Sequence, residues 1–356
     1  MPRHLHFGAG ALGLGLILPV LSQSGLEIVV VQRAGRKIES LAESSGLFEV
    51  EFIGGLSGMR EIKPFSAGSL LPLGSDCEPA INALASEDTI LVTTSLTWQG
   101  LEELVPVLRE GLLRRGEGHP TLTVLFCENT IGENCQALID EEQWEQRVEF
   151  LPSVVDRMCG IDEAYSSRVR VQAEEYSWWV TGRPTEESVA KLLAGLGIQL
   201  VDDVRPYRVL KRYMVNIPHL AVTLMARRAG WPSVAIYLRT TTGERYLKGV
   251  FRECVEVMAH HATSQAVDMP FTEDYVRGFG EEVFTRFQLN PEATTRVLKL
   301  LRRDTLPQFS KALLERLVVP AEDHIQVFGS PPTHLTQALH AAVRMMSLED
   351  WTVLPG

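Results

Sequence analysis

The chain has 356 residues, of which 45% are hydrophobic and 22% are charged, as in an ordinary globular protein of about two domains. Its 34 basic and 45 acidic residues give a net charge of −11, which disfavours binding to nucleic acid or to anionic membranes and restricts an anionic substrate to a local basic pocket. The five cysteines form no Cys-x-x-Cys pair, and no segment resembles a signal peptide or a membrane span, so we expect a cytoplasmic protein with reduced thiols.

A glycine-rich stretch near the N-terminus is the first functional signal. Arg3–Phe7 is predicted to be a strand, and a helix is expected to follow and to end near Ser24-Gly25. Between them lie Gly8, Ala9, Gly10, Ala11, Leu12 and Gly13. In this context the first glycine allows a tight turn, the second lets the backbone approach a pyrophosphate, and the third packs the helix on the strand. The stretch therefore predicts NAD(P) binding at the helix N-terminus, with a purely structural turn as the alternative.

The end of the second predicted strand, Glu27–Val31, bears on the choice of cofactor. A carboxylate about 20 residues after the third glycine commonly binds the adenosine ribose of NAD. Here Gln32 occupies that place, and Arg33, Arg36 and Lys37 follow it. Gln32 and Arg33 therefore predict tolerance of, or preference for, the 2′-phosphate of NADP. A solvated basic turn is the other interpretation.

Further strands and helices alternate, which favours a doubly wound parallel sheet. A third group of residues, Thr93, Thr94 and Ser95, ends one of these strands, where ligands bind in such sheets, so we expect contact with the nicotinamide half of the cofactor. Hydroxyl residues are also common at strand ends without a ligand. The predicted strands are Thr89–Thr94 and Leu122–Phe126, with helices at Gly100–Arg114 and Glu133–Gln143, an extra hairpin within Gly54–Pro64, and strands Val169–Val171 and Trp178–Thr181 that extend the sheet.

From Arg205 onward the hydrophobic pattern has a helical period. We therefore predict a Rossmann-like dinucleotide-binding domain over residues 1–204 and a mainly α-helical substrate and catalytic domain over residues 205–356. The predicted helices are Val209–Ala229, Tyr246–Ala266, Thr272–Thr285, Glu292–Arg303 and Leu335–Met346.

The pattern Lys211-x4-Asn216-x2-His219 carries the candidate chemistry. At about 100° per residue, these three side chains fall within an arc of about 140° on a helix. Oxidation of an alcohol needs a base for the hydroxyl proton and donors for the developing alkoxide, and a lysine can serve as base once its pKa falls from about 10.4 toward 7–8. The alternative is a solvated lysine, a capping asparagine and a half-buried histidine. Pro218 requires the helix to kink or to start there, because its ring clashes with the carbonyl of Met214.

Together these residues resemble the polyol-specific long-chain dehydrogenases, the mannitol dehydrogenase family, and most of all its mannitol-1-phosphate 5-dehydrogenase branch. The likeness runs in the same order along nearly the whole chain. It is carried by His6-Phe7-Gly8-Ala9-Gly10, Cys127-Glu128-Asn129, Val155-Asp156-Arg157, Glu175-Tyr176-Ser177-Trp178-Trp179, Lys211-x4-Asn216-x2-His219 and Arg286-Phe287 with Asn290-Pro291.

The resemblance implies a role for each matching residue. Lys211 would be the general base in oxidation and the acid in reduction, while Asn129 and Asn216 would stabilise the alkoxide. His219 would bind a substrate hydroxyl. Asp156 and Arg157 would orient the substrate or form a structural ion pair. An arginine is expected after Asn290-Pro291, with Arg296, Arg302 and Arg303 as candidates, of which we take Arg303 as the substrate residue.

The sequence therefore predicts a metal-independent NAD(P)-dependent dehydrogenase that interconverts a sugar alcohol, mannitol 1-phosphate or a related polyol, with its ketose. A small-molecule substrate and a monomer or weak oligomer are expected. Two alternatives stay open. One is a reductase of a small keto acid that resembles ketopantoate reductase, and the other is a catalytically silent NAD(P)-binding sensor.

Overall fold

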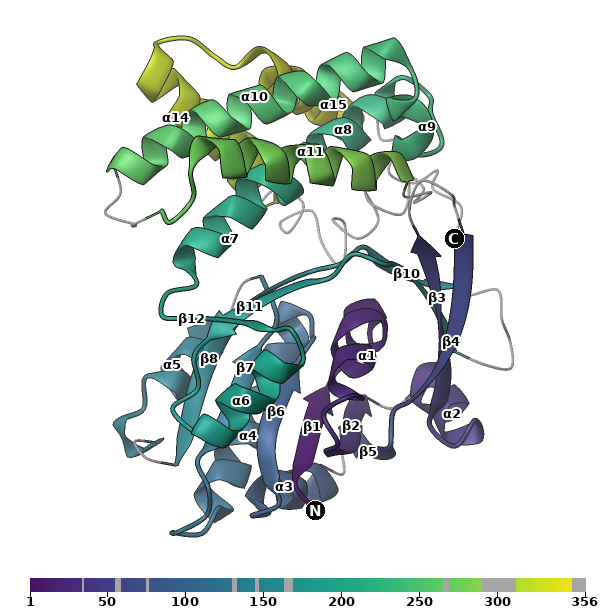
Figure 1. Cartoon of the computed structure of the whole chain (residues 1–356), viewed down its shortest axis with the longest axis vertical. Coiled ribbons are helices and arrows are strands. Elements are labelled where there is room, and N and C mark those ends of the chain that lie inside the picture. Colours follow the sequence, from purple (N-terminus) through teal and green to yellow (C-terminus); the bar gives the residue numbers. More distant parts are fainter. Residues whose placement is uncertain are drawn as a thin grey trace. The chain divides into compact units, whose positions relative to one another are not determined.

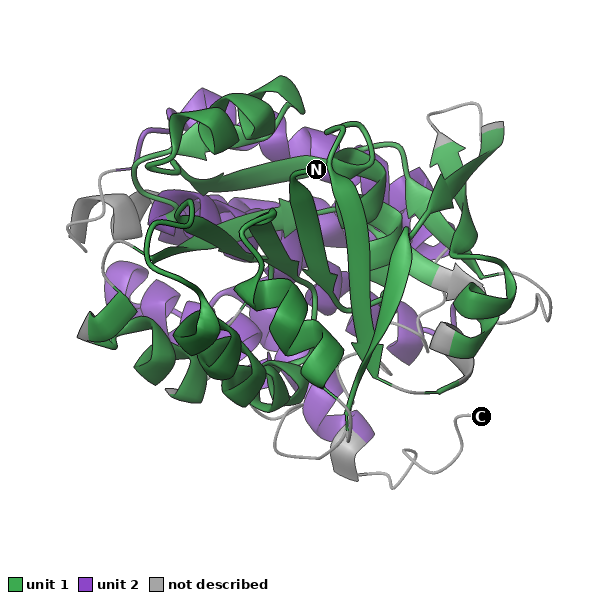
Figure 2. Cartoon of the chain, turned by 90° about the horizontal axis from the view of Figure 1, so that it is seen from below, with its two compact units in different colours: residues 1–204 green, residues 205–356 purple. Residues whose placement is uncertain are grey.

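The computed structural model describes residues 1–33, 35–54, 59–74, 77–129, 133–144, 147–162, 169–264, 269–289 and 312–347. The chain forms two compact units, Met1–Val204 and Arg205–Gly356, which are coloured separately in Figure 2.

Unit 1 is built on an eight-stranded sheet in the order β12-β11-β8-β7-β6-β1-β2-β5 (Figure 1). The neighbouring strands β5, β2, β1, β6, β7 and β8 are all parallel. The next strand, β11, is antiparallel to β8. Strands β2 and β5 extend the sheet on one side of β1, and the chain then crosses to β6 on the other side. The strand order thus reverses between β1 and β6, where ligands bind in open α/β sheets. The strands are β1 (Arg3–Phe7), β2 (Glu27–Arg33), β5 (Ser69–Leu73), β6 (Thr89–Thr94), β7 (Leu122–Phe126), β8 (Val148–Asp156), β11 (Trp178–Gly182) and β12 (Gln199–Val201).

Helices bury both faces of this sheet, which explains the continuous apolar runs in its central strands. Neighbouring residues of one strand enter different cores. Val92 packs in a core with Leu104 and Leu108, whereas Leu91 packs in a second core with Ile17. The helical segments of unit 1 are η1 (Gly13–Ile17), α1 (Leu18–Leu21), α2 (Arg36–Glu43), α3 (Glu78–Ala85), α4 (Trp98–Arg114), α5 (Glu133–Ile139), η2 (Glu142–Trp144) and α6 (Glu187–Gly195).

A second sheet has four strands in the order β4-β3-β10-β9. The predicted hairpin is present but longer, because β3 (Leu47–Gly54) pairs antiparallel with β4 (Met59–Ser66). The prediction that Val169–Val171 extends the main sheet is wrong, since β10 (Arg170–Glu174) pairs with β3 and with β9 (Cys159–Asp162). The reason is tertiary. Val171 is buried with Phe48 of β3 and with Leu14 of the glycine-loop helix, in a core of its own.

Unit 2 is helical in its described residues. A continuous helical segment opens it, made of α7, η3 and α8, and the predicted helix Glu292–Arg303 lies outside the described residues. The elements are α7 (Arg205–Lys211), η3 (Arg212–Asn216), α8 (Ile217–Arg228), α9 (Val234–Leu238), α10 (Thr241–Ser264), α11 (Glu273–Leu289), η4 (Leu314–Val318), α14 (Val319–Phe328) and α15 (Thr333–Ser347).

Proline accompanies each π-helical turn found in the described chain. Turns η1, η3 and η4 are followed, two residues after their last residue, by Pro19, Pro218 and Pro320. A proline has no N–H, and its ring clashes with the carbonyl four residues earlier. A turn closed by i→i+5 hydrogen bonds accommodates both features without ending the helix.

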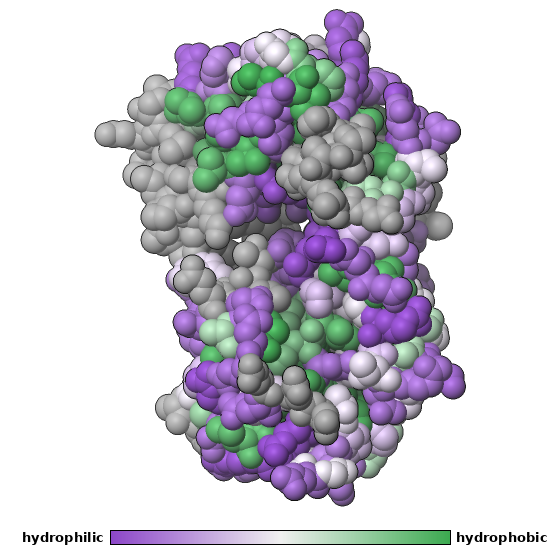
Figure 3. All heavy atoms as spheres, turned by 90° about the vertical axis from the view of Figure 1, so that its left-hand side faces the viewer, coloured by the Kyte–Doolittle hydropathy of each residue, from purple (hydrophilic) through white to green (hydrophobic). Residues whose placement is uncertain are grey.

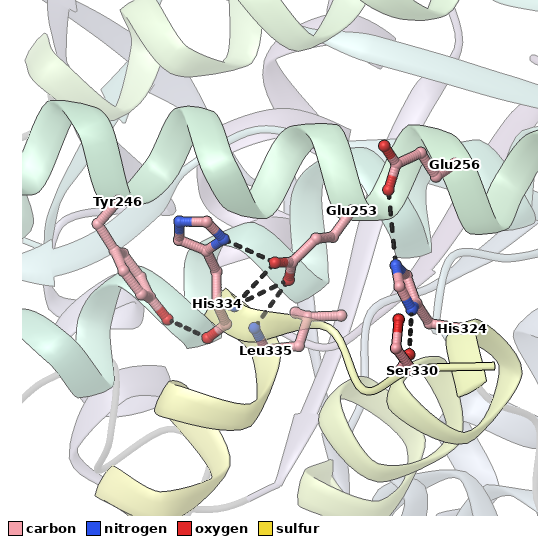
Figure 4. Close-up of polar contacts among 7 residues, drawn as sticks. All are labelled: Tyr246, Glu253, Glu256, His324, Ser330, His334 and Leu335. Carbon is pink, nitrogen blue, oxygen red and sulfur yellow. Dashed lines mark hydrogen bonds and ion pairs between the residues drawn. The ribbon is translucent and has the colours of Figure 1, made fainter. Parts of the chain in front are cut away.

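Glu253 of α10 fixes the start of α15. Figure 4 shows its carboxylate directed at this helix end, where it accepts hydrogen bonds from the backbone N–H of His334 at 2.8 Å and of Leu335 at 2.9 Å. The His334 ring contacts the same carboxylate through Nδ1 at 2.6 Å, and the hydroxyl of Tyr246 donates to the His334 carbonyl. Because a buried carboxylate satisfies backbone donors of the first turn, these contacts hold α15 against α10.

Polar and apolar side chains intermix over the described surface drawn in Figure 3. The described helices include none that is both long enough and apolar enough to cross a membrane.

Candidate functional site

The glycine loop, residues 8–13, follows β1 at the place where the strand order of the sheet reverses between β1 and β6. Gly8 has φ +112°, a conformation that favours glycine, and a Cβ on it would lie 2.7 Å from the carbonyl oxygen of Ser95. A Cβ on Gly13 would lie 2.2 Å from the Gly8 carbonyl oxygen and 2.6 Å from His6 Nε2. Beside Gly10, in contrast, the nearest atom is 3.8 Å away. Packing therefore requires the first and third glycines, and the second leaves room for a ligand beside the backbone.

Two buried histidines of β1 share one threonine as a hydrogen-bond partner, and one of them, His6, contacts the loop directly. His6 Nε2 lies 2.8 Å from the Gly8 carbonyl, which can only accept, so Nε2 carries the proton and Nδ1 accepts from Thr93 Oγ1 at 2.7 Å. The threonine oxygen then accepts from His4 Nε2, also at 2.7 Å. Burial lowers the pKa of His6 to about 4, and burial with the nearby His6 lowers that of His4 well below its ordinary value. Both rings are therefore neutral at pH 7.

The three hydroxyl residues at the end of β6 have different surroundings. Thr93 and Thr94 are fully buried, and Thr94 donates to Glu128. Ser95 is partly exposed and donates to the Gly8 carbonyl at 2.9 Å. Contact of these residues with a cofactor stays a prediction, and Ser95 is the one whose side chain reaches the surface beside the loop.

Gln32 contacts the loop directly. Its side-chain oxygen accepts a hydrogen bond of 2.7 Å from the backbone N–H of Ala9. Arg33 is exposed, and its guanidinium lies 3.4 Å from Glu103. The side chains of Arg36 and Lys37 lie outside the described residues. The NADP prediction therefore depends on Gln32, which braces the loop, and on Arg33, whose exposed ion pair is weak enough to exchange for a phosphate.

A buried carboxylate that was not predicted lies beside this site. Glu128, two residues after the end of β7, accepts from the Thr94 hydroxyl at 2.6 Å and from the Leu96 N–H at 2.7 Å. Burial raises its pKa to about 7, against the effect of these hydrogen bonds. Its neighbour Asn129 is exposed. A carboxylate two residues beyond an apolar central strand is the sequence signal that could have identified it.

Arg157 has a structural position. Its guanidinium donates to the backbone carbonyls of Gly15, Tyr176 and Glu175 at 2.8–3.0 Å, and it stacks on the ring of Phe52. These contacts join the end of β8 to the glycine-loop helix and to the turn before β11. Its neighbour Asp156 is buried. The contacts of Arg157 favour the structural interpretation over substrate orientation.

Lys211, Asn216 and His219 lie on the continuous α7–η3–α8 segment of unit 2. Lys211 is buried, with 8% of its surface exposed, while Asn216 and His219 are partly exposed. The His219 ring stacks on Phe287 of α11, with ring centroids 5.0 Å apart. Arg303, the predicted substrate arginine, lies outside the described residues, as do Asn290 and Pro291.

The π turn changes the angular relation of these residues. The N–H of Ile217 donates to the carbonyl of Arg212, five residues earlier. The predicted arc of about 140° assumed an α-helix that turns by about 100° at every residue. That assumption is wrong between Lys211 and Asn216, where the helix contains a π turn. Because a turn closed by i→i+5 bonds contains more residues than an α-helical turn, residues five apart lie closer to one face. The turn thus brings Asn216 toward the face of the helix that carries Lys211.

The sequence matches known proteins along most of its length. Residues 2–191 match the family model of the mannitol dehydrogenase Rossmann domain. The mannitol-1-phosphate 5-dehydrogenase of Anoxybacillus flavithermus is 26% identical over 347 residues, which cover 95% of this chain and 86% of that protein. The enzyme of the same name from Arthrobacter sp. is 26% identical over 359 residues, covering 98% and 87%.

Solved structures share the fold at lower identity. A D-sorbitol dehydrogenase has a TM-score of 0.68 at 16% identity, covering 97% of this chain and 80% of that one. The mannitol 2-dehydrogenase of Pseudomonas fluorescens, solved with NAD and D-mannitol, has a TM-score of 0.61 at 17% identity, covering 96% and 78%. A ketopantoate reductase from Ralstonia eutropha has a TM-score of 0.58 at 15% identity, covering 98% and 99%. These likenesses show a Rossmann-like domain followed by a helical domain.

Proposed function

The chain belongs to the mannitol dehydrogenase family, and we propose that it interconverts mannitol 1-phosphate, or a related polyol, with fructose 6-phosphate or the corresponding ketose. It is an oxidoreductase that acts on CH–OH groups. The observation that carries the proposal is the single helical segment that holds a buried Lys211 together with Asn216 and His219. The mannitol-1-phosphate 5-dehydrogenases, similar over most of the chain, support the choice of substrate.

The residues around the glycine loop fit NAD(P). The open space beside Gly10 and the helix that starts directly after the loop suit a pyrophosphate, which would accept hydrogen bonds from the first-turn N–H groups. When bound, the nicotinamide supplies the acceptor or donor of the hydride. The hydrogen bonds of His6 and Ser95 to the Gly8 carbonyl keep the loop in one conformation.

The side chains of the helix supply the proton chemistry. Lys211 takes the proton of the reacting hydroxyl in oxidation and returns it in reduction. The side-chain amides of Asn216 and Asn129 donate to the alkoxide oxygen as charge develops on it. His219, whose ring orientation is fixed by Phe287, donates to a second substrate hydroxyl. In this proposal the lysine performs the proton transfer without a metal ion.

An assay of the purified chain with a matrix of substrates and cofactors tests the function. Fructose 6-phosphate, fructose and ketopantoate are each combined with NADH and NADPH, and the loss of nicotinamide absorbance is followed. Rapid oxidation with fructose 6-phosphate is the expected result. If only ketopantoate is turned over, the substrate is a keto acid and not a polyol. Binding of NAD(P)H without any turnover would favour a sensor.

We also propose a reducing compartment and a monomer or weak oligomer. All five cysteines are free thiols, which supports the first point. Size-exclusion chromatography with light scattering tests the second.

A further inference from the structure

Arg208 of α7 presents a guanidinium edge that no group in the described part of the chain binds. Its Nε and Nη2 atoms are both buried, and within the described chain neither has a hydrogen-bond partner. Burial lowers the pKa of this arginine. The residue as a whole is partly exposed, so other parts of Arg208 reach the surface. Buried N–H groups without an acceptor are costly, and those of a charged group cost most.

The same edge is occupied on other arginines of this protein. Arg3 uses Nε and Nη2 together on the carboxylate of Glu27, Arg170 uses them on Glu49, and Arg277 uses them on Glu273. In these three cases the partner is a carboxylate, whereas the same two nitrogens of Arg157 and Arg212 donate to backbone carbonyls. The paired N–H groups match the geometry of carboxylates and phosphates. The free edge of Arg208 therefore has the shape and charge of a binding site for an oxyanion.

Its position places this edge beside the candidate general base. Arg208 precedes Lys211 by three residues in α7, so the two side chains leave neighbouring points on one helix face, with Cβ atoms about 5–6 Å apart. Arg212, on the same face, is already engaged by the backbone carbonyl of Glu315. Between Asp203 and Glu244 the sequence contains no carboxylate side chain. In a chain with a net charge of −11, this segment is a local basic region that can attract an anion.

We propose that the Nε–Nη2 edge of Arg208 binds the phosphate monoester of a phosphorylated polyol or ketose whose hydroxyl or carbonyl group faces Lys211. The inference rests on the proposed function and names a residue that selects phosphorylated over unphosphorylated substrates. A carboxylate shares the chemistry, and a sugar acid is the other source of such a group.

Arg208→Gln tests the proposal, with Arg227→Gln on the exposed end of α8 as the matched control. Steady-state constants are measured for fructose 6-phosphate and for fructose. We expect Arg208→Gln to raise KM for fructose 6-phosphate by about 10- to 100-fold, the loss of a charged hydrogen-bond pair, with little change for fructose. Arg208→Lys keeps the charge but loses the paired geometry, so an intermediate KM is expected. Far-UV circular dichroism confirms folding of each variant.

A binding measurement separates this inference from the proposed function. Titration calorimetry with inorganic phosphate, and with acetate at equal ionic strength, requires no turnover. Phosphate binding that is present in the wild type and in Arg227→Gln but lost in Arg208→Gln supports the inference even if no ketose is reduced. Equal phosphate binding by Arg208→Gln, an equal loss of activity on both ketoses, or a preference for acetate over phosphate would overturn it.

Discussion

The hydroxyl of Thr94 lies 2.6 Å from the carboxyl of Glu128, and this contact joins the ends of β6 and β7 directly beside Asn129. The same carboxyl accepts from Leu96, so one buried acid fixes two chain segments at the carboxyl edge of the sheet. Between β6 and its neighbour β1, Thr93 donates to the His6 ring, which in turn donates to the Gly8 carbonyl. The candidate cofactor site is therefore supported by two buried groups, Glu128 and His6. Burial raises the pKa of the first and lowers that of the second, so pH affects their contributions to stability in opposite directions.

The first prediction concerns the pH dependence of stability. The folded pKa of Glu128 is raised from 4.5 to about 7, so its stabilising contribution is complete below pH 4.5 and is lost as pH rises through 7. The folded pKa of His6 is lowered from 6.5 to about 4, so its contribution is complete above pH 6.5 and is lost as pH falls through 4. Each shift corresponds to about 3 kcal/mol, and the two oppose each other.

Glu128→Gln removes one of these two effects. The free energy of unfolding of the variant should therefore rise with pH between 4.5 and 6.5 more steeply than that of the wild type. Urea unfolding at a series of pH values measures both. Glu117→Gln, at a strongly exposed position, is the control and should follow the wild type. Parallel curves for Glu128→Gln and wild type would contradict the raised pKa.

The second prediction concerns the third glycine of the loop. Gly13→Ala places a Cβ 2.2 Å from the Gly8 carbonyl oxygen and 2.6 Å from His6 Nε2, so the loop must move. We expect loss of NAD(P)H binding, measured by nicotinamide fluorescence, and a loss of stability of about 1–3 kcal/mol. Gly278→Ala in α11 is the matched control, because a Cβ there meets no atom within 4 Å, and it should stabilise the helix by about 1 kcal/mol. Tight cofactor binding by Gly13→Ala would show that the loop tolerates the displacement.

The third prediction concerns the general base. Lys211→Ala should lower kcat by about 10²- to 10⁴-fold while the Kd for NAD(P)H stays the same, because the lysine transfers a proton and is assigned no contact with the cofactor. Single-turnover kinetics and a fluorescence titration give the two values. Asn129→Ala should lower kcat by about 10²- to 10³-fold, the loss of one oxyanion donor. Lys211→Ala with wild-type turnover would remove the lysine from the mechanism.

The fourth prediction concerns Pro218 and the π turn. Pro218→Ala restores an N–H that can donate to the carbonyl four residues earlier, at Met214, so the turn can become α-helical. An α-helical turn contains one residue fewer than a turn closed by i→i+5 bonds. The change would therefore rotate Asn216 by about 100° away from the helix face that carries Lys211. We therefore expect kcat to fall by at least about 10-fold without loss of stability. Pro320→Ala, which follows the π turn η4, is the control and should leave kcat unchanged. Equal kcat for both variants and wild type would show that the turn has no role in catalysis.

The fifth prediction concerns the cofactor phosphate. If Arg33 binds the 2′-phosphate, Arg33→Gln should lower kcat/KM for NADPH by about 10-fold or more and leave that for NADH nearly unchanged. The wild type must first show that it uses NADPH. A strong preference of the wild type for NADH would contradict the assignment of Gln32 and Arg33.

Local sequence identified much of the sheet and the glycine loop. The strands Arg3–Phe7, Thr89–Thr94 and Leu122–Phe126 have their predicted bounds, because strands buried on both faces form continuous apolar runs between polar turns. The glycine loop was recognisable because three glycines between a strand and a helix satisfy a local steric requirement. The lysine, asparagine and histidine were identified by their spacing along the chain and by a family resemblance.

Other features depend on partners that are distant in sequence, which only the tertiary structure defines. The strand Arg170–Glu174 joins the second sheet because its side chains pack on Phe48 and Leu14, more than a hundred residues earlier. The pKa of Glu128 is raised because folding buries its carboxyl group beside Thr94 and Leu96. Likewise, the free edge of Arg208 exists only once the chain has packed around it. Periodicity and turn chemistry are read within a few residues, whereas burial and hydrogen-bond partnership are properties of the whole fold.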